Sequence, residues 1–303
     1  MLCQKLTKQG KDIGIKGGKM NILKKLTALG LTVVITAGLA ACGGGGSSAK
    51  DVMKTAQDKL KDVKSLSYDM VMDMDFSAGE QTIESDTTAK IDYTTDPLAM
   101  KINMAMDMGA QGSADITMYA EKLDDKYMMY MTMDGVNWAK QTLGDASELE
   151  QYNAQNSMEL YLNGIENFKE AGTEKINGSD ATRYDGVISQ DAMGDVMASS
   201  GAADKFTQYG LTETQIEELY KDLGDLPASV WIDNESSLPV KYEMDMTGVM
   251  QQMFTKVVES SNQNLPSDFK VDKMFITMTL TNFNNVDKIT VPDAARNGQE
   301  AAF

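Results

Sequence analysis

The sequence predicts an α+β fold: one curved antiparallel sheet of about 10–12 strands, with helices packed on its concave face. Three observations predict it. Apolar residues, many of them methionines, alternate with polar residues along several segments, which is the pattern of a half-buried antiparallel strand. Other segments repeat apolar residues every three or four positions, which is typical of amphipathic helices. No linker-like composition interrupts residues 49–303, so we expect a single domain there.

The N-terminal segment has the pattern of a secretion signal. Lys24 and Lys25 precede an uncharged apolar run at 26–41, which is shorter than the roughly 20 residues that a spanning helix needs. The run fits the apolar region of a signal peptide. We therefore expect residues 1–41 to be a signal peptide, with Met20 as its true initiator.

The end of that run resembles a bacterial lipobox. Leu39, Ala40 and Ala41 stand directly before Cys42, the residue that a lipobox places for lipidation, and glycine and serine fill the rest of residues 42–48. A buried helix ending in a free cysteine is the alternative, but a flexible tether of this kind does not usually follow one. We expect a diacylglycerol-modified, palmitate-bearing Cys42 that anchors the protein on the outer, extracytoplasmic face of the cell membrane.

The domain begins with a predicted amphipathic helix at Ala49–Lys64, after which the apolar period changes to two. Residues 67–142 are predicted to form a meander of about six strands. Tyr68–Phe76 is the clearest of them, because its aromatic residues and methionines share one side and its aspartates take the other. Turns are predicted at the glycine-containing breaks 78–80, 109–113 and 134–135.

The second half of the domain mixes helical and strand patterns. Asp145–Glu170 and residues 190–224 have helical spacing, and a turn at Asn177-Gly178 between them joins two short strands. The later elements are expected in this order: a strand at Ser229–Asp233, a turn at Asn234–Ser237, a strand at Leu238–Met246, a short helix at 248–260, a strand at Val271–Phe283 and a closing segment at Val286–Pro292.

Composition excludes several classes of function. A net charge of −17 disfavours binding to nucleic acid, because the phosphates need lysine and arginine. The chain has no histidine, which removes the commonest general base and metal ligand. It also lacks a nucleophile elbow and a phosphate-binding glycine loop. We therefore expect no enzyme, no cofactor and no metal site.

The 24 methionines are concentrated in the period-two stripes. Such a stripe can simply be the buried side of a sheet, or it can be an adaptable wall for an apolar ligand. Copper binding is disfavoured, because Ile102, Tyr127 and Val240 continue the stripes and cannot bind the metal. The predicted ligand-binding residues are Met70, Met72, Met104, Met106, Met129, Met131, Met244 and Met246.

Aspartates occupy the opposite side of the same strands. A calcium site on this acidic side is a second metal alternative, but no calcium-binding loop sequence is present, and carboxylates along a strand are usually just solvated. The aspartates concerned are Asp69, Asp73, Asp75 and Asp107.

The order of these features resembles the LolA/LppX-like bacterial lipoproteins, and in particular an uncharacterised lipoprotein family of Firmicutes with that fold. The resemblance covers residues 49–295. It follows the lipobox, the first helix and the meander, and then three stretches rich in turn residues: Asp134–Trp138, Val230–Tyr242 and Asn285–Asp293. The resemblance implies a half-barrel whose concave face holds acyl chains and serves the transfer of lipids or lipoproteins.

The sequence thus predicts a monomeric, membrane-anchored lipoprotein that binds a lipid or another apolar ligand in a methionine-lined concave sheet. The alternative is a non-enzymatic surface module that binds a protein or a cell-wall partner. The sequence leaves open whether the concave face is a cavity or is filled by the protein's own helices.

Overall fold

The structure is a computed structural model. It describes residues 48–109, 112–123, 126–143, 162–190, 192, 212, 214, 223–261 and 268–301. The predicted signal peptide, the lipobox and Cys42 lie outside the described residues, as do most of the predicted helices at 145–170 and 190–224. Within the described part, no helix has both the length and the apolar character needed to span a membrane.

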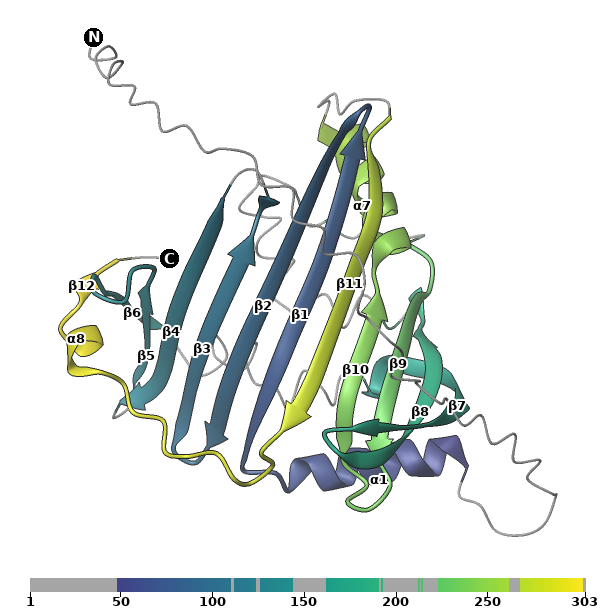
Figure 1. The fold of residues 1–303 in the computed structure, drawn as a ribbon, viewed down its shortest axis with the longest axis horizontal. Helices are drawn as coiled ribbons and strands as arrows, with labels where there is room; N and C mark the ends of the chain where they lie inside the picture. Colours follow the sequence, from purple (N-terminus) through teal and green to yellow (C-terminus); the bar gives the residue numbers. More distant parts are fainter. Residues whose placement is uncertain are drawn as a thin grey trace, which may run out of the picture. The chain divides into compact units, whose positions relative to one another are not determined.

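Twelve strands from the described residues form one open, curled sheet (Figure 1). Every neighbouring pair of strands is antiparallel except the pair at one edge of the sheet, where β12 runs parallel to β6. This confirms the predicted antiparallel sheet. In spatial order, the strands are β12 (Gln299–Glu300), β6 (Ala139–Leu143), β5 (Lys126–Thr132), β4 (Ser113–Leu123), β3 (Leu98–Asp107), β2 (Gln81–Thr95), β1 (Ser65–Ala78), β11 (Lys270–Thr281), β10 (Pro239–Asp245), β9 (Leu226–Asp233), β8 (Ser179–Ile188) and β7 (Ile165–Ile176).

The meander predicted for residues 67–142 is confirmed as β1 to β6. Three of its hairpins, β1–β2, β3–β4 and β5–β6, turn where the sequence places glycine, and Gly79, Gly109 and Gly135 all have positive φ angles, which cost glycine little. The turns at Asn177-Gly178 and Asn234–Ser237 are also present. Turn chemistry therefore sets where the strands end.

One face of the sheet is defined by the apolar side of β1, which carries Tyr68, Met70, Met72, Met74 and Phe76. Residues directly opposite one another on neighbouring strands share a face, so the strand register extends this face to both sides. We call it the methionine face. The other face, here the polar face, carries the exposed ion pair Asp69–Lys90 and the half-buried pair Asp73–Lys273, with 3.0 Å between charged atoms in each pair.

Two helices pack against the methionine face on the side of the sheet formed by β7 to β11. The first is α1 (Ala49–Lys61), which begins in a capping box between Ser48 and Asp51 and buries Met53, Ala56 and Leu60. The second is α7 (Thr247–Ser261), which confirms the helix predicted at 248–260. Figure 1 shows α1 near the end of the sheet where β1 begins and α7 near the end where β1 finishes.

The helix predicted at Asp145–Glu170 is wrong in its last turn. The described part begins as a helix at Leu162, but strand β7 starts at Ile165 and pairs with β8. Asn167 has a φ of 57°, and two bulges interrupt the pairing. Pairing with the neighbouring strand overrides the helical spacing of the apolar residues at this point.

A bulge also changes the face on which Val240 lies. We expected Val240 to share a face with Tyr242, Met244 and Met246, but the β9–β10 register shifts between Pro239 and Lys241. Val240 packs instead with Trp231. One extra residue in a strand reverses the alternation beyond it.

The C-terminal segment differs from the expectation in its details. Residues 286–292, expected to close the fold, have no regular secondary structure and lead into α8 (Asp293–Arg296) and β12. This segment covers the polar face at β5, where Tyr130 is buried with Val291 and Ala295. Burial raises the pKa of Tyr130 to about 12, so its hydroxyl stays protonated and donates to Glu121.

Candidate functional site

Four of the eight predicted methionines lie in two neighbouring rows on β1 and β3. In one row Met104 is opposite Ala89 of β2, which is opposite Met70. The next row brings the second methionine of each strand together on either side of Thr87. All four side chains are half-buried. The structure therefore brings residues from separate strands into one methionine-rich area.

The two methionines of β5 extend this area across the sheet. Met131 is opposite Met118 of β4, and Met129 is opposite Ala120. Met131 is half-buried, whereas Met129 is only 5% exposed. Met129 belongs to a buried cluster, built on β2 to β6, that includes Ile91. The alternation thus persists over five strands of the meander.

The remaining two methionines serve as core contacts of helix α7. Met244 of β10 is opposite Ile276 of β11, which is opposite Met72. Met244 is 5% exposed and belongs to the same buried cluster as Val249 and Met253 of α7. Met246 packs against this cluster. At this end the methionine face is filled by the protein's own helix, whereas the strip on β1, β3 and β5 keeps partly accessible methionines.

The α7 end of the strip is closed by three aromatic rings. Phe76 of β1 lies 5.9 Å from Phe254 of α7 and 6.1 Å from Phe269, measured between ring centres. Phe254 and Phe269 are 5.4 Å apart in an edge-to-face arrangement. These rings continue the apolar surface from the methionines to the helix.

One buried hydroxyl on the same face has no partner among the residues that the structure describes. The hydroxyl of Tyr242 makes no hydrogen bond among the described residues, and burial raises the pKa of Tyr242 well above its usual value. Tyr242 lies opposite Met278 of β11. Sequence reasoning placed it on the apolar side of its strand but did not single out its hydroxyl, because the lack of a partner becomes visible only in the packed structure.

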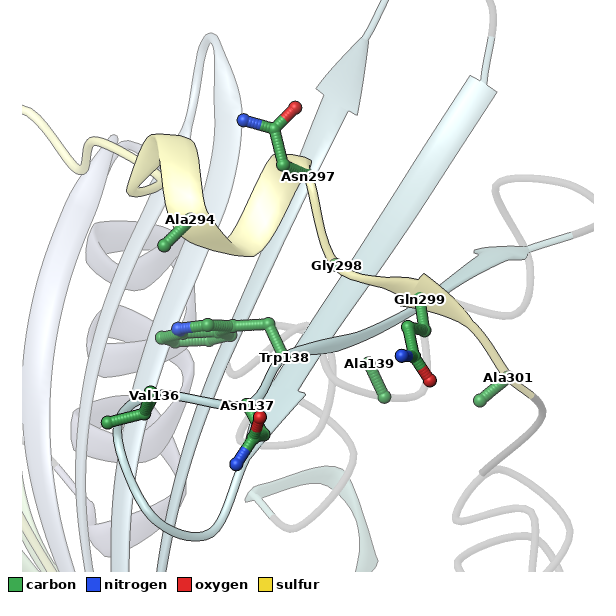
Figure 2. Close-up of a pocket in the computed structure, with 9 residues that line it drawn as sticks. All are labelled: Val136, Asn137, Trp138, Ala139, Ala294, Asn297, Gly298, Gln299 and Ala301. Carbon is green, nitrogen blue, oxygen red and sulfur yellow. The ribbon is translucent and has the colours of Figure 1, made fainter.

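A second feature lies at the other end of the sheet, between the β5–β6 turn and the C-terminal segment. It is an open pocket of about 480 Å³ (Figure 2). Figure 2 shows the Trp138 ring below α8, with the β5–β6 turn beneath it and β12 beside β6. The pocket is lined by Val136, Asn137, Trp138, Ala139, Ala294, Asn297, Gly298, Gln299 and Ala301.

The turn side of this pocket is held by Asp134. Its carboxylate accepts hydrogen bonds from the backbone N–H of Asn137 at 2.7 Å and of Val136 at 2.9 Å, and from the Asn137 side chain at 2.6 Å. These bonds stabilise the ionised form and hold the pKa of Asp134 well below its usual value. Sequence reasoning identified this stretch as turn chemistry and missed the pocket.

The C-terminal side is held by backbone pairing and an ion pair. The N–H of Gln299 donates to the carbonyl of Trp138 at 2.9 Å, which aligns β12 with β6. Arg296 binds both carboxylate oxygens of Glu121, at 3.1 and 2.9 Å. Hydrogen bonding to Glu121 raises the pKa of Arg296. Both walls of the pocket are therefore fixed by contacts within the protein.

The polar face does not gather its aspartates into a metal site. Among the described residues, no group of three or more histidine, cysteine, aspartate or glutamate side chains is placed to hold a metal ion. Asp69 and Asp73 are instead engaged by lysines across the strands. Donation to Asp73 raises the pKa of Lys273.

Comparisons with solved structures find weak likenesses. The chain is similar to the lipoprotein LppX of Mycobacterium tuberculosis, with 16% identity and a TM-score of 0.42 over 80% of this chain and 100% of that one. It is also similar to LprF of Mycobacterium bovis, with 13% identity and a TM-score of 0.45 over 84% of this chain and 100% of LprF. The LolA superfamily protein NE2245 of Nitrosomonas europaea shares 9% identity with the chain, with a TM-score of 0.20 over 82% of this chain and 96% of NE2245. These TM-scores are too low to establish a shared fold.

The comparison with curated proteins finds no match. At the level of protein families the result is clear: residues 48–300 match a family described as a family of unknown function, DUF6612, and the chain belongs to it.

Proposed function

We propose that this protein is an extracytoplasmic lipoprotein that binds a lipid or another apolar ligand on the methionine face. The observation that carries the proposal is the strip of methionines on β1, β3 and β5, half-buried except for the buried Met129, which is continuous across the strand register. Burying a fully exposed methionine is worth about 1.5–3 kcal/mol, so a ligand that covers the remaining exposed part of several half-buried methionines gains a fraction of this from each of them.

The side-chain chemistry of the strip favours an adaptable site. Methionine is unbranched and polarisable, so it repacks around ligands of different shape. A ligand held in this way depends on many small contacts and on no single residue. In this proposal the strip lies on the concave side of the sheet, and α7 bounds it at the end where Phe76 meets Phe254.

A titration tests ligand binding. The residues from Gly46 onward, which form one compact unit, are mixed with a fluorescent fatty-acyl probe in the absence of detergent. We expect saturable binding that unlabelled lipid competes away. Fluorescence that rises linearly with probe concentration, without saturation or competition, contradicts the proposal.

Anchoring through Cys42 is the second part of the proposal. The substitution Cys42→Ser removes the thiol that would carry the lipid, so we expect the protein to move from the membrane fraction to the soluble fraction. Immunoblotting of the two fractions measures the shift. The matched control is Ser47→Ala in the neighbouring tether, which keeps the Cys42 thiol and leaves the protein in the membrane fraction. A Cys42→Ser protein that stays with the membrane overturns the lipobox assignment.

A non-enzymatic surface module that binds a protein or a cell-wall partner remains the alternative function. The pocket at the β5–β6 turn is the feature that favours it, since this pocket is lined by polar groups and lies on a different part of the sheet from the methionine strip.

A further inference from the structure

We propose that the pocket between the β5–β6 turn and β12 binds an uncharged sugar ring of a glycan. This site is separate from the methionine face, and it goes beyond the proposed lipid binding. The proposal rests on three properties of the pocket: the chemistry of its lining, the rigidity of its walls and its size.

The lining has no charge but is rich in carboxamides. None of the nine lining residues is charged, although the chain carries a net charge of −17. Asn137, Asn297 and Gln299 supply amide groups, which both donate and accept hydrogen bonds, as sugar hydroxyls do. One N–H of the Asn137 amide donates to Asp134, which holds the side chain in place and leaves its carbonyl oxygen to accept and its second N–H to donate. An ionic ligand finds no counter-charge in this lining.

The indole of Trp138 provides the apolar surface that a sugar ring needs. A pyranose has an apolar side made of C–H groups and an equatorial rim of hydroxyls, so it suits an aromatic ring surrounded by amides. Trp138 packs against Tyr119 with 5.9 Å between ring centres, which fixes the indole before a ligand arrives. An acyl chain placed here would cover the three amides without pairing them, which is unfavourable.

The walls are fixed too closely to collapse into the pocket. Gly298 lies so near the β6 backbone that a Cβ there would be 2.6 Å from the carbonyl oxygen of Trp138 and 2.9 Å from that of Ala295. The side chain of Lys140 also holds this segment, donating to the carbonyl of Arg296 at 3.1 Å. A preformed site loses little conformational freedom on binding.

The size also fits. The pocket encloses about 480 Å³, within the range of about 300–1,000 Å³ that is typical of small-molecule sites. Its open side leaves room for a sugar chain to continue outward, so we infer that the ligand is one residue of a longer glycan.

The test is calorimetric titration of the full chain carrying Cys42→Ser with a neutral trimer of N-acetylglucosamine. We expect saturable binding. In Trp138→Ala the affinity falls at least tenfold, because the indole surface is lost. The double substitution Asn297→Ala with Gln299→Ala weakens binding similarly. Both of these side chains are exposed, so this variant keeps the proposal testable if Trp138→Ala does not fold.

Two further arms separate this site from its alternatives. The double variant Met104→Asp with Met106→Asp retains sugar binding, since these residues lie on the other face and on another strand. A pull-down on insoluble cell-wall glycan, compared with the soluble trimer, shows whether the source is a polymer or a free sugar. Absence of binding in both assays overturns the proposal, as does undiminished binding by the two pocket variants.

Discussion

The combined substitutions Met104→Asp and Met106→Asp abolish the binding of an apolar ligand. Both residues lie on β3 in the centre of the methionine strip, opposite Ala89 and Thr87 of β2. Each carboxylate would have to lose its water as the ligand covers it, and an uncompensated charge in an apolar contact is strongly unfavourable. We expect affinity for the fluorescent acyl probe to fall more than about 100-fold, which corresponds to roughly 2.8 kcal/mol or more.

The matched control places the same two charges on the opposite face. Thr88 of β2 and Asn103 of β3 are both exposed on the polar face and lie near Lys90. The variant Thr88→Asp with Asn103→Asp should bind the probe as the unmodified protein does. Circular dichroism checks that both double variants are folded. Tight probe binding by a folded Met104→Asp, Met106→Asp protein means that the ligand does not use the methionine strip.

The substitution Trp231→Ala should cause the largest loss of stability. Trp231 is 1% exposed and packs with Ala181 and Val240. Its ring lies beneath the amino group of Lys241, 4.3 Å from the ring centre, and its indole N–H donates to Glu174. Truncation removes these contacts and leaves a cavity, so we expect the free energy of unfolding to fall by about 3–5 kcal/mol.

Urea denaturation of the two proteins measures this loss, and Trp231→Phe is its control. Phenylalanine keeps most of the buried ring and its contact with Lys241 but removes the N–H donor to Glu174. We expect a smaller loss, of about 1–2 kcal/mol. A loss in the free energy of unfolding that is smaller for Trp231→Ala than for Trp231→Phe would mean that the buried cluster around Trp231 does not stabilise this end of the sheet.

The sheet could be predicted because its signal is local. In β1 the alternation of Tyr68, Met70 and Met72 with aspartates fixes both the strand and the face that it buries. Glycine then fixes where the β1–β2, β3–β4 and β5–β6 hairpins close. The same reasoning placed the methionines of β1, β3 and β5 on one face without any knowledge of which strands are neighbours.

Other features depend on contacts that the sequence pattern does not contain. Strand β7 begins at Ile165 within a stretch of helical spacing, because β8 supplies its hydrogen-bond partners. The bulge beside Val240 cannot be read from an alternation that continues unbroken through it. Strand β12 has two residues, too few for any period, and its place beside β6 depends on contacts made outside the strand, such as the ion pair of Arg296 with Glu121.

The sugar-binding pocket was missed for a similar reason. Its walls come from the β5–β6 turn and from residues beyond Ala294, which lie far apart in the sequence. Neither stretch carries a recognised binding motif. Contacts between the two stretches, including the close approach of Gly298 to the Trp138 carbonyl, bring their amides around one indole. A tryptophan directly after a hairpin turn is the one signal that could have drawn attention to it.

The most direct test of the central claim is native mass spectrometry of the unit from Gly46 to Phe303, purified from bacterial cells without detergent. We predict a second species, heavier than the bare chain by the mass of an acyl-bearing molecule, which is lost on collisional activation. The same preparation of Met104→Asp with Met106→Asp should show the bare mass alone. A bare mass in the unmodified protein, both before and after incubation with lipid vesicles, would contradict the assignment of the methionine face as a ligand-binding surface.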